Sequence, residues 1–148
     1  MLRISKLTDY AILVMVELGR ENALLSAHSL ADRMGLEIPT VSKVLKLLAG
    51  GGLLESVRGP AGGYRLCDSL AETSVADVIA AIEGPIAMTE CSVEPGLCSQ
   101  EDHCGLQSNW QRISVAVSRA LQEVSLAEMA SPATAAADPL QLHTLDAR

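Results

Sequence analysis

The sequence predicts a mainly α-helical fold with a small β-hairpin wing: a winged helix-turn-helix followed by a long dimerisation helix. Three observations lead to this prediction. Apolar residues recur at helical spacing in three consecutive segments of the first 50 residues. A turn rich in Gly and Pro, RGPAGG, separates two short strand-like segments. A long amphipathic segment then follows near the C-terminus.

Composition limits the class of protein. The 148 residues suit one compact domain or a small domain with an appendage, and the chain has no Phe, one Trp and two Tyr. We find no secretory signal, and the apolar run AILVMV is far too short to span a membrane. We therefore expect a cytoplasmic protein with no membrane partner. In a reducing cytosol, clustered cysteines favour metal ligands or redox sensors over disulfides.

The charge is divided unequally along the chain. The net charge is −7, but residues 1–66 carry eight Lys or Arg against six Asp or Glu, whereas residues 67–148 carry three against twelve. Only the first half is therefore suited to contact a polyanion.

Three helices are predicted in the first half. The first runs from about Thr8 to Arg20. The second lies in SAHSLADRMG, where Ser26 suits an N-cap and Gly35 a stop. The third begins near Pro39 and ends at the glycines 50–52. The apolar stripes of these helices comprise Leu7, Ala11, Val14, Met15 and Leu18, then Leu30, Ala31 and Met34, then Val41, Val44, Leu45 and Leu48.

The second half contains two further predicted helices. The segment SVADVIAAIEGP has a capping-box pattern at Ser74 and Asp77 and closes at Gly84-Pro85. The segment GLQSNWQRISVAVSRALQEVSLAEM reads as one long helix. Its apolar stripe needs a partner, which is either a second copy of the same helix, the favoured interpretation, or the first domain of the same chain. The stripe comprises Trp110, Ile113, Val117, Leu121 and Val124.

The expected organisation has four parts. Residues 1–85 form the winged helix-turn-helix, 86–105 a cysteine loop, 106–130 the dimerisation helix and 131–148 a disordered tail.

The third helix and the hairpin predict a DNA-binding surface. A recognition helix presents polar side chains on one face while its other face packs on the domain. An arginine at a hairpin tip, here Arg58, is suited to enter a minor groove, and Arg65 and Arg33 are candidates for phosphate contacts. The alternative is an ordinary solvated surface with a tight turn. The helix candidates are Thr40, Ser42, Lys43 and Lys46.

Three of the four cysteines lie close together. Cys91, Cys98 and Cys104 have the spacing C-x6-C-x5-C, without the CxxC pairs of zinc sites. Wider gaps in a loop with Gly and Pro suit an iron–sulfur cluster, and the alternative is three unliganded thiols. Cys67, at the end of the hairpin, is interpreted as a small buried residue.

These motifs resemble the winged-helix iron–sulfur transcription regulators of the IscR and NsrR kind. The resemblance covers roughly residues 1–130 and is carried by MLRISKLTDYA, SLADRMGLEIPTVSKVLKLLAGGGLLESVRGPAGGYRL, SVADVIAAIEG and the cysteine triplet. It implies a homodimer with a long crossed dimerisation helix, and a cluster held by the three cysteines between that helix and the DNA-binding domain. A 4Fe–4S cluster is favoured, and 2Fe–2S is the alternative.

The resemblance also bears on a fourth cluster ligand. In one branch a histidine follows the third cysteine by three residues, but this chain has Gln107 there. In the nitric-oxide-sensing branch an aspartate of the first helix of the other subunit serves, and KLTDYA places Asp9 at that position. Asp9 is favoured, and His103, water or a thiol are the alternatives.

The expected function follows from the resemblance. It implies a repressor that binds a double-stranded DNA operator, senses iron–sulfur status and controls SUF-type cluster-assembly genes. A nitric-oxide-sensing repressor and a cluster-carrying electron-transfer protein are the alternatives. The sequence has no nucleophile–base pair and no phosphate loop, so neither an enzyme nor a small-molecule substrate is expected.

Overall fold

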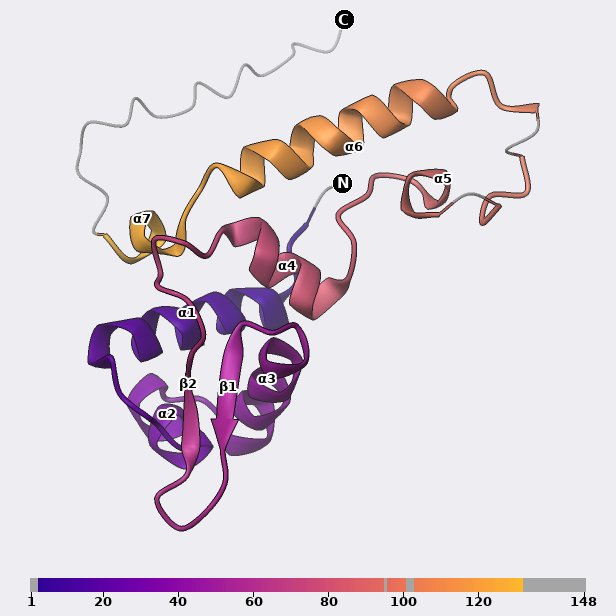
Figure 1. Cartoon of the computed structure of the whole chain (residues 1–148). Helices are drawn as coiled ribbons and strands as arrows, with labels where there is room; N and C mark the ends of the chain where they lie inside the picture. Colours follow the sequence, from indigo (N-terminus) through magenta and orange to yellow (C-terminus); the bar gives the residue numbers. More distant parts are fainter. Residues whose placement is uncertain (1–2, 95, 101–102, 132–148) are drawn as a thin grey trace, which may run out of the picture.

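A computed structural model describes residues 3–94, 96–100 and 103–131. The first half forms a head of three helices, α1 (Lys6–Glu21), α2 (Ala27–Met34) and α3 (Ile38–Gly50), and a two-stranded hairpin. Helix α4 (Val75–Glu83) packs on this head (Figure 1). An arm, defined here as residues 86–106, leaves α4, and α6 returns from it toward the head. The expected tail lies outside the described residues from position 132 onward. None of the helices described is long and apolar enough to cross a bilayer.

The helix-turn-helix forms as predicted. Helix α1 (Lys6–Glu21) begins two residues before the expected start, because the Ser5 side chain accepts a hydrogen bond from the Thr8 N–H. Helix α2 (Ala27–Met34) has Ser26 as its N-cap and Gly35 as a left-handed C-cap. Helix α3 (Ile38–Gly50) follows after a short turn.

The predicted apolar stripes meet in one core. Helix α1 packs against α3, α4 and α7 (Leu126–Ala130), and α2 packs against α3. Only Leu7 and Met34 of the predicted stripe residues in these three helices are partly exposed. The largest side chains that are fully buried in this core are Met15, Leu18, Leu30, Leu45, Leu48 and Leu126.

The hairpin is a wing of two antiparallel strands, β1 (Leu54–Val57) and β2 (Gly63–Leu66). Leu54 pairs with Leu66 on the side of the core, and Glu55 pairs with Arg65 on the opposite, exposed face. The wing is tied to the head where the Tyr64 N–H donates to the Leu25 carbonyl at 2.8 Å. A Cβ at Gly63 would lie 2.5 Å from that carbonyl oxygen, so this close approach requires glycine.

Helix α4 (Val75–Glu83) has the predicted capping box of Ser74 and Asp77. A short helix that was not predicted, α5 (Glu90–Val93), interrupts the cysteine loop and packs against α6. Cys91 lies inside α5 and is buried.

The prediction of one continuous helix to Met129 is wrong. The segment forms α6 (Gln107–Gln122) and a separate α7 (Leu126–Ala130). Residues 123–125 leave the helix because the chain here pairs with the segment that leads into α4. The Val75 N–H donates to the Val124 carbonyl, and the Leu126 N–H donates to the Thr73 carbonyl, both at 2.9 Å. A second capping box, Ser125 with Glu128, starts α7. That pattern, SLAE, was readable in the sequence.

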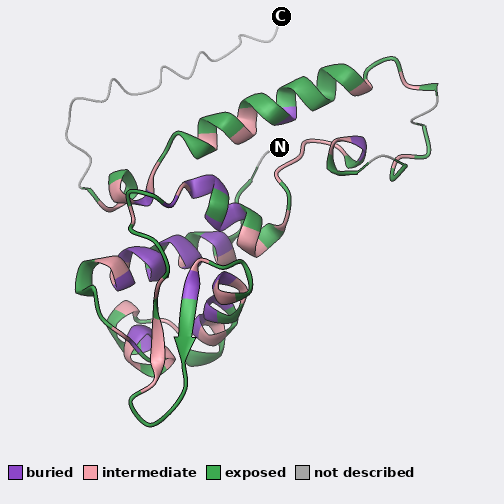
Figure 2. Cartoon of the chain, in the orientation of Figure 1, coloured by how far each residue is buried: buried purple, intermediate pink, exposed green. Residues whose placement is uncertain are grey.

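The break between α6 and α7 changes which residues of this segment are buried against the head. Leu126 of α7 enters the core of the head, whereas the only buried residue of α6 is Ser114. Figure 2 shows that most of α6 is exposed. Its exposed large apolar residues include Trp110, Ile113 and Val115. Within the described part of the chain, the apolar stripe of α6 is therefore only partly covered.

Candidate nucleic-acid interface and cysteine arm

The outer face of α3 carries the predicted recognition residues. Lys43 and Lys46 are exposed, and Thr40 and Ser42 are half-buried. Neither lysine has a salt-bridge partner among the residues that the structure describes. The opposite face of α3 is buried in the core through Val41, Val44, Leu45 and Leu48. The helix therefore presents two free positive charges on a rigidly packed element.

The wing presents a third cation. Arg58 directly follows β1 and is exposed at the turn, where Gly59 has a φ of +120°. No salt bridge engages Arg58 within the described residues. The wing loop projects beyond the helices of the head (Figure 1), so Arg58 lies in a projecting turn.

The other two candidate arginines are paired with acids. Arg65 contacts the Oε2 atom of Glu55 through Nε at 2.8 Å and Nη2 at 2.7 Å. Arg33 lies 2.7 Å from Glu21 and 3.3 Å from Glu17, and its pKa is raised, first by the hydrogen bond to Glu21. These arginines are not free cations, a distinction that the sequence alone does not make.

The three clustered cysteines all lie on the arm. Cys91 is 7% exposed, and its Sγ lies 3.3 Å from the Thr89 hydroxyl. Cys98 and Cys104 are half-buried in the loop after α5. The arm is attached to α6 where the Met88 N–H donates to the Ser114 hydroxyl at 3.0 Å.

The described residues of one chain do not bring three cysteine, histidine or acidic side chains together in a group able to hold a metal. Asp9 is exposed in the first turn of α1, and His103 is exposed on the arm. Three cysteines on one arm nevertheless provide the sulfur donors that an iron–sulfur cluster requires, so the residues fit that group. Binding of such a cluster would require the arm to bring these side chains together.

Cys67 differs from its predicted environment. We expected a small buried residue, but Cys67 is exposed. The chain leaves the wing at this point, where the Cys67 N–H donates to the Leu53 carbonyl and holds only the backbone against the head.

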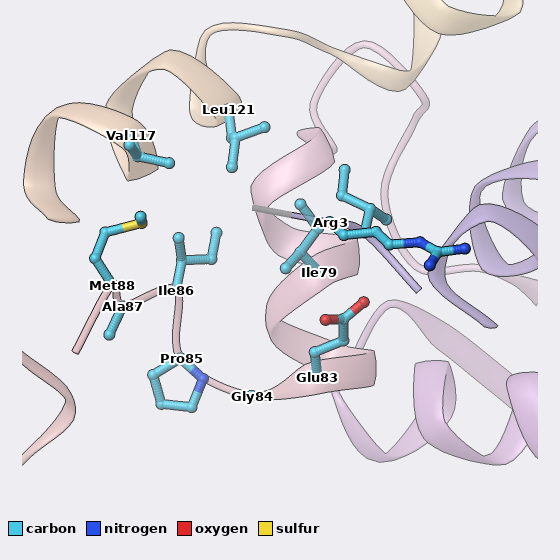
Figure 3. Close-up of a pocket in the computed structure, with 11 residues that line it drawn as sticks. Arg3, Ile79, Glu83, Gly84, Pro85, Ile86, Ala87, Met88, Val117 and Leu121 are labelled. Atoms are coloured by element: carbon cyan, nitrogen blue, oxygen red, sulfur yellow. The ribbon is translucent and has the colours of Figure 1, made fainter. Parts of the chain in front are cut away.

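A pocket of about 260 Å³ lies at the base of the arm, between α4 and α6. Figure 3 shows Ile86, Met88, Val117 and Leu121 converging on it, with Glu83 at the end of α4 on another side. The carboxylate of Glu83 accepts hydrogen bonds from the Thr8 hydroxyl and from the Ser5 N–H, the latter at 3.0 Å. These bonds, led by that from Thr8, lower the pKa of Glu83. No sequence pattern marks Glu83 or Ser114 as a residue that joins distant segments of the chain.

Comparisons with known proteins agree with this architecture. The family model described as "Rrf2: Iron-dependent Transcriptional regulator" matches residues 4–132. The HTH-type transcriptional regulator IscR of Serratia proteamaculans (strain 568) is 28% identical over 130 residues, which are 86% of this chain and 79% of the relative.

Two solved structures are also similar. CymR (YrzC), described as the global cysteine regulator of B. subtilis, has a TM-score of 0.66 and 29% identity, covering 88% of this chain and 97% of CymR. T. potens IscR has a TM-score of 0.61 and 26% identity, covering 86% of this chain and 85% of IscR. With the head, the wing and the family match in agreement, this chain belongs to the Rrf2 family of winged-helix transcriptional regulators.

Proposed function

We propose that this chain is a homodimeric repressor that binds an operator through α3 and the wing and carries an iron–sulfur cluster on its arm. Lys43, Lys46 and Arg58 would contribute the free positive charge, with Thr40 and Ser42 beside them on α3. The dimer would place two α3 helices in successive major grooves of a pseudo-palindromic site.

The observation that carries this proposal is the position of the arm. The segment that bears Cys91, Cys98 and Cys104 directly joins α4 of the head to α6. A change in the arm therefore acts at once on the DNA-binding head and on the helix proposed for dimerisation. The family description as iron-dependent and the similarity to IscR support a cluster at this place.

The proposed cluster ligands are Cys91, Cys98 and Cys104, with Asp9 of the second subunit as the fourth. A bound cluster would supply iron that responds to cluster supply, oxygen or nitric oxide. Asp9 is exposed and does not join the cysteines within one chain, as expected of a ligand that is offered to another subunit. A carboxylate binds iron less tightly than a thiolate does, which suits a labile position. A 4Fe–4S cluster is the favoured type, and 2Fe–2S is the alternative. His103 is the alternative ligand.

A second copy of this chain is the proposed partner of α6. Trp110 and Ile113, three residues apart on one face of that helix, are 37% and 43% exposed. A helix with such a face is stabilised when an equivalent helix covers it, and two-fold pairing does this for both copies at once.

The chain's own contacts provide a route between the arm and the head. The Met88–Ser114 hydrogen bond fixes the start of the arm on α6, and Ile86 packs in the pocket between α4 and α6. Displacement of residues 86–88 would therefore alter the packing of α4 against α6. Because α4 packs on both α1 and α3, such a change reaches the recognition helix.

The proposed targets are SUF-type cluster-assembly genes, and nitric-oxide detoxification genes are the alternative within the same mechanism. A second candidate function follows from the similarity to CymR, described as a global cysteine regulator. In that case the thiols of the arm would respond to sulfur metabolism, and the protein would act without iron.

The test is Mössbauer spectroscopy of oxygen-free wild-type protein beside Asp9→Ala, with iron and sulfide quantified. The proposal expects a cubane with one distinct iron whose signature changes in Asp9→Ala. An unchanged spectrum, or a two-iron signature with a nitrogen ligand, would transfer the fourth-ligand role to His103. Protein that lacks iron after anaerobic reconstitution, and that still binds its own promoter DNA, would favour the CymR-like function.

A further inference from the structure

We propose that Glu55 limits the affinity of this protein for non-operator DNA by neutralising Arg65 on the exposed face of the wing. This inference rests on the proposed DNA-binding function and concerns how strongly the wing attracts any duplex. It begins from the Glu55–Arg65 ion pair, in which two guanidinium nitrogens contact one carboxylate oxygen at 2.7 and 2.8 Å.

The strand register makes this pair persistent. Glu55 and Arg65 are directly opposite each other in the β1–β2 ladder, so the backbone holds their Cβ atoms within about 5.5 Å. Neither side chain has to be brought to the other from a distance, which removes much of the entropic cost of a surface ion pair. Both side chains are more than half exposed, so the pair faces solvent.

The same register determines what a phosphate would meet. The neighbouring Leu54–Leu66 pair points to the core, so Glu55 and Arg65 lie on the outward face of the wing, and Arg58 follows in the exposed turn after β1. Even where the guanidinium turns toward a phosphate, the carboxylate of Glu55 accompanies it, because the ladder fixes the two residues together. The pair then approaches the polyanion with no net charge, and Arg58 is left as the free cation of the wing.

Sequence-independent affinity for DNA arises mainly from counterions released by phosphate contacts, with a slope of about 0.9 in log K against log salt for each contact. A neutralised arginine adds little to this slope. Weak non-specific binding raises the share of protein that occupies the operator, because a genome offers a large excess of competing sites. Glu55 therefore acts as a specificity-determining residue.

The test measures binding of a fluorescently labelled duplex of mixed sequence over a range of salt concentrations, for wild type, Glu55→Gln, Arg65→Gln and the double variant. Glu55→Gln should steepen the slope by about 0.9, so that affinity falls about threefold more between roughly 50 and 200 mM salt than it does for wild type. The double variant, which has the same net charge as wild type, should return to the wild-type slope.

The control is Glu123→Gln, which removes one negative charge from an exposed position at the end of α6. Its slope should equal that of wild type. A Glu55→Gln slope equal to that of Glu123→Gln would overturn the inference, and so would a double variant as steep as Glu55→Gln, because the gain would then not pass through Arg65. Wild-type protein that binds neither this duplex nor its own promoter DNA would instead remove the proposed function.

Discussion

The buried hydroxyl of Thr8 donates a hydrogen bond to the carboxylate of Glu83, and this joins the first turn of α1 to the last turn of α4. The Ser5 N–H donates to the same carboxylate oxygen. The contact lies next to Asp9, the proposed cluster ligand, and directly before the arm. It is a link between two segments 75 residues apart in the sequence.

This link predicts a pH dependence of stability. Because the folded-state pKa of Glu83 is lowered, its contribution to the free energy of unfolding is present above the unfolded pKa of about 4.3 and is lost as the pH falls through the folded pKa. Denaturant unfolding from pH 7 to pH 3 should therefore show a stability gap between wild type and Glu83→Gln that closes at acidic pH. Thr8→Val should cost about 1 kcal/mol at pH 7, a low value for a charged acceptor because Glu83 faces solvent. A gap that stays constant with pH would contradict the assignment.

The contact between the wing and the head predicts a strict requirement for glycine. Gly63→Ala should destabilise the protein, because its Cβ would lie 2.5 Å from the Leu25 carbonyl oxygen, and backbone cannot move aside as a side chain does. We expect a loss of about 1–3 kcal/mol in chemical denaturation. Gly50→Ala is the matched control, because a Cβ there meets nothing within 4 Å. Equal stability of the two variants would show that the strand does not approach Leu25 so closely.

The break between α6 and α7 predicts unequal roles for two residues of α7. Leu126 is fully buried in the core of the head, whereas Met129 is 51% exposed. Leu126→Ala should lower the free energy of unfolding by about 2–5 kcal/mol, and Met129→Ala by less than about 1 kcal/mol. A single helix that continued past residue 125 would remove this contrast, so similar losses in thermal and denaturant unfolding would argue for the continuous helix.

The position of the three cysteines on the arm predicts which thiols bind the proposed, coloured iron–sulfur cluster. Cys98→Ala should abolish the visible absorption of anaerobically reconstituted protein while leaving a folded dimer by circular dichroism and size-exclusion chromatography. Cys67→Ala, which removes an exposed thiol outside the arm, should keep the full colour. A fully coloured Cys98→Ala protein would place the cluster elsewhere.

The free cation of the wing predicts a direct effect on operator affinity. Arg58→Ala should weaken binding to the protein's own promoter DNA by about 1–3 kcal/mol if the side chain reads a groove. Arg20→Ala removes the same charge from the last turn of α1 and should change affinity much less. Fluorescence anisotropy at fixed salt measures both, and equal losses would mean that Arg58 contributes only net charge.

Much of the head was predictable because its signals are local. Ser26 and Gly35 bound α2, Pro39 opens α3, and Ser74 with Asp77 starts α4, each at the position read from the sequence. The apolar stripes of α1 and α3 are buried as their spacing indicates, except for the partly exposed Leu7. Capping, helical periodicity and turn chemistry act within a few residues, so the sequence contains them in full.

The cysteine arm was predictable only in part. The spacing of Cys91, Cys98 and Cys104 favours a cluster, and this remains a prediction because the described residues of one chain do not gather the three thiols. Helix α5 and the anchor of Met88 on Ser114 had no sequence signal. A side-chain hydroxyl that accepts a backbone N–H 26 residues away leaves no local pattern.

The sequence by itself determined the helix-turn-helix, the wing, and the cations Lys43, Lys46 and Arg58 on its surface. Only the tertiary structure decided that Arg65 is neutralised by Glu55, that Cys67 is exposed, and that the last helix breaks before Leu126. The break in the last helix shows the physical reason most directly. Helical periodicity persists through residues 123–125, but the backbone groups there gain more from pairing with residues 73–75 and from burying Leu126 than from one more helical turn. That balance depends on a partner segment about 50 residues away, which no local pattern describes.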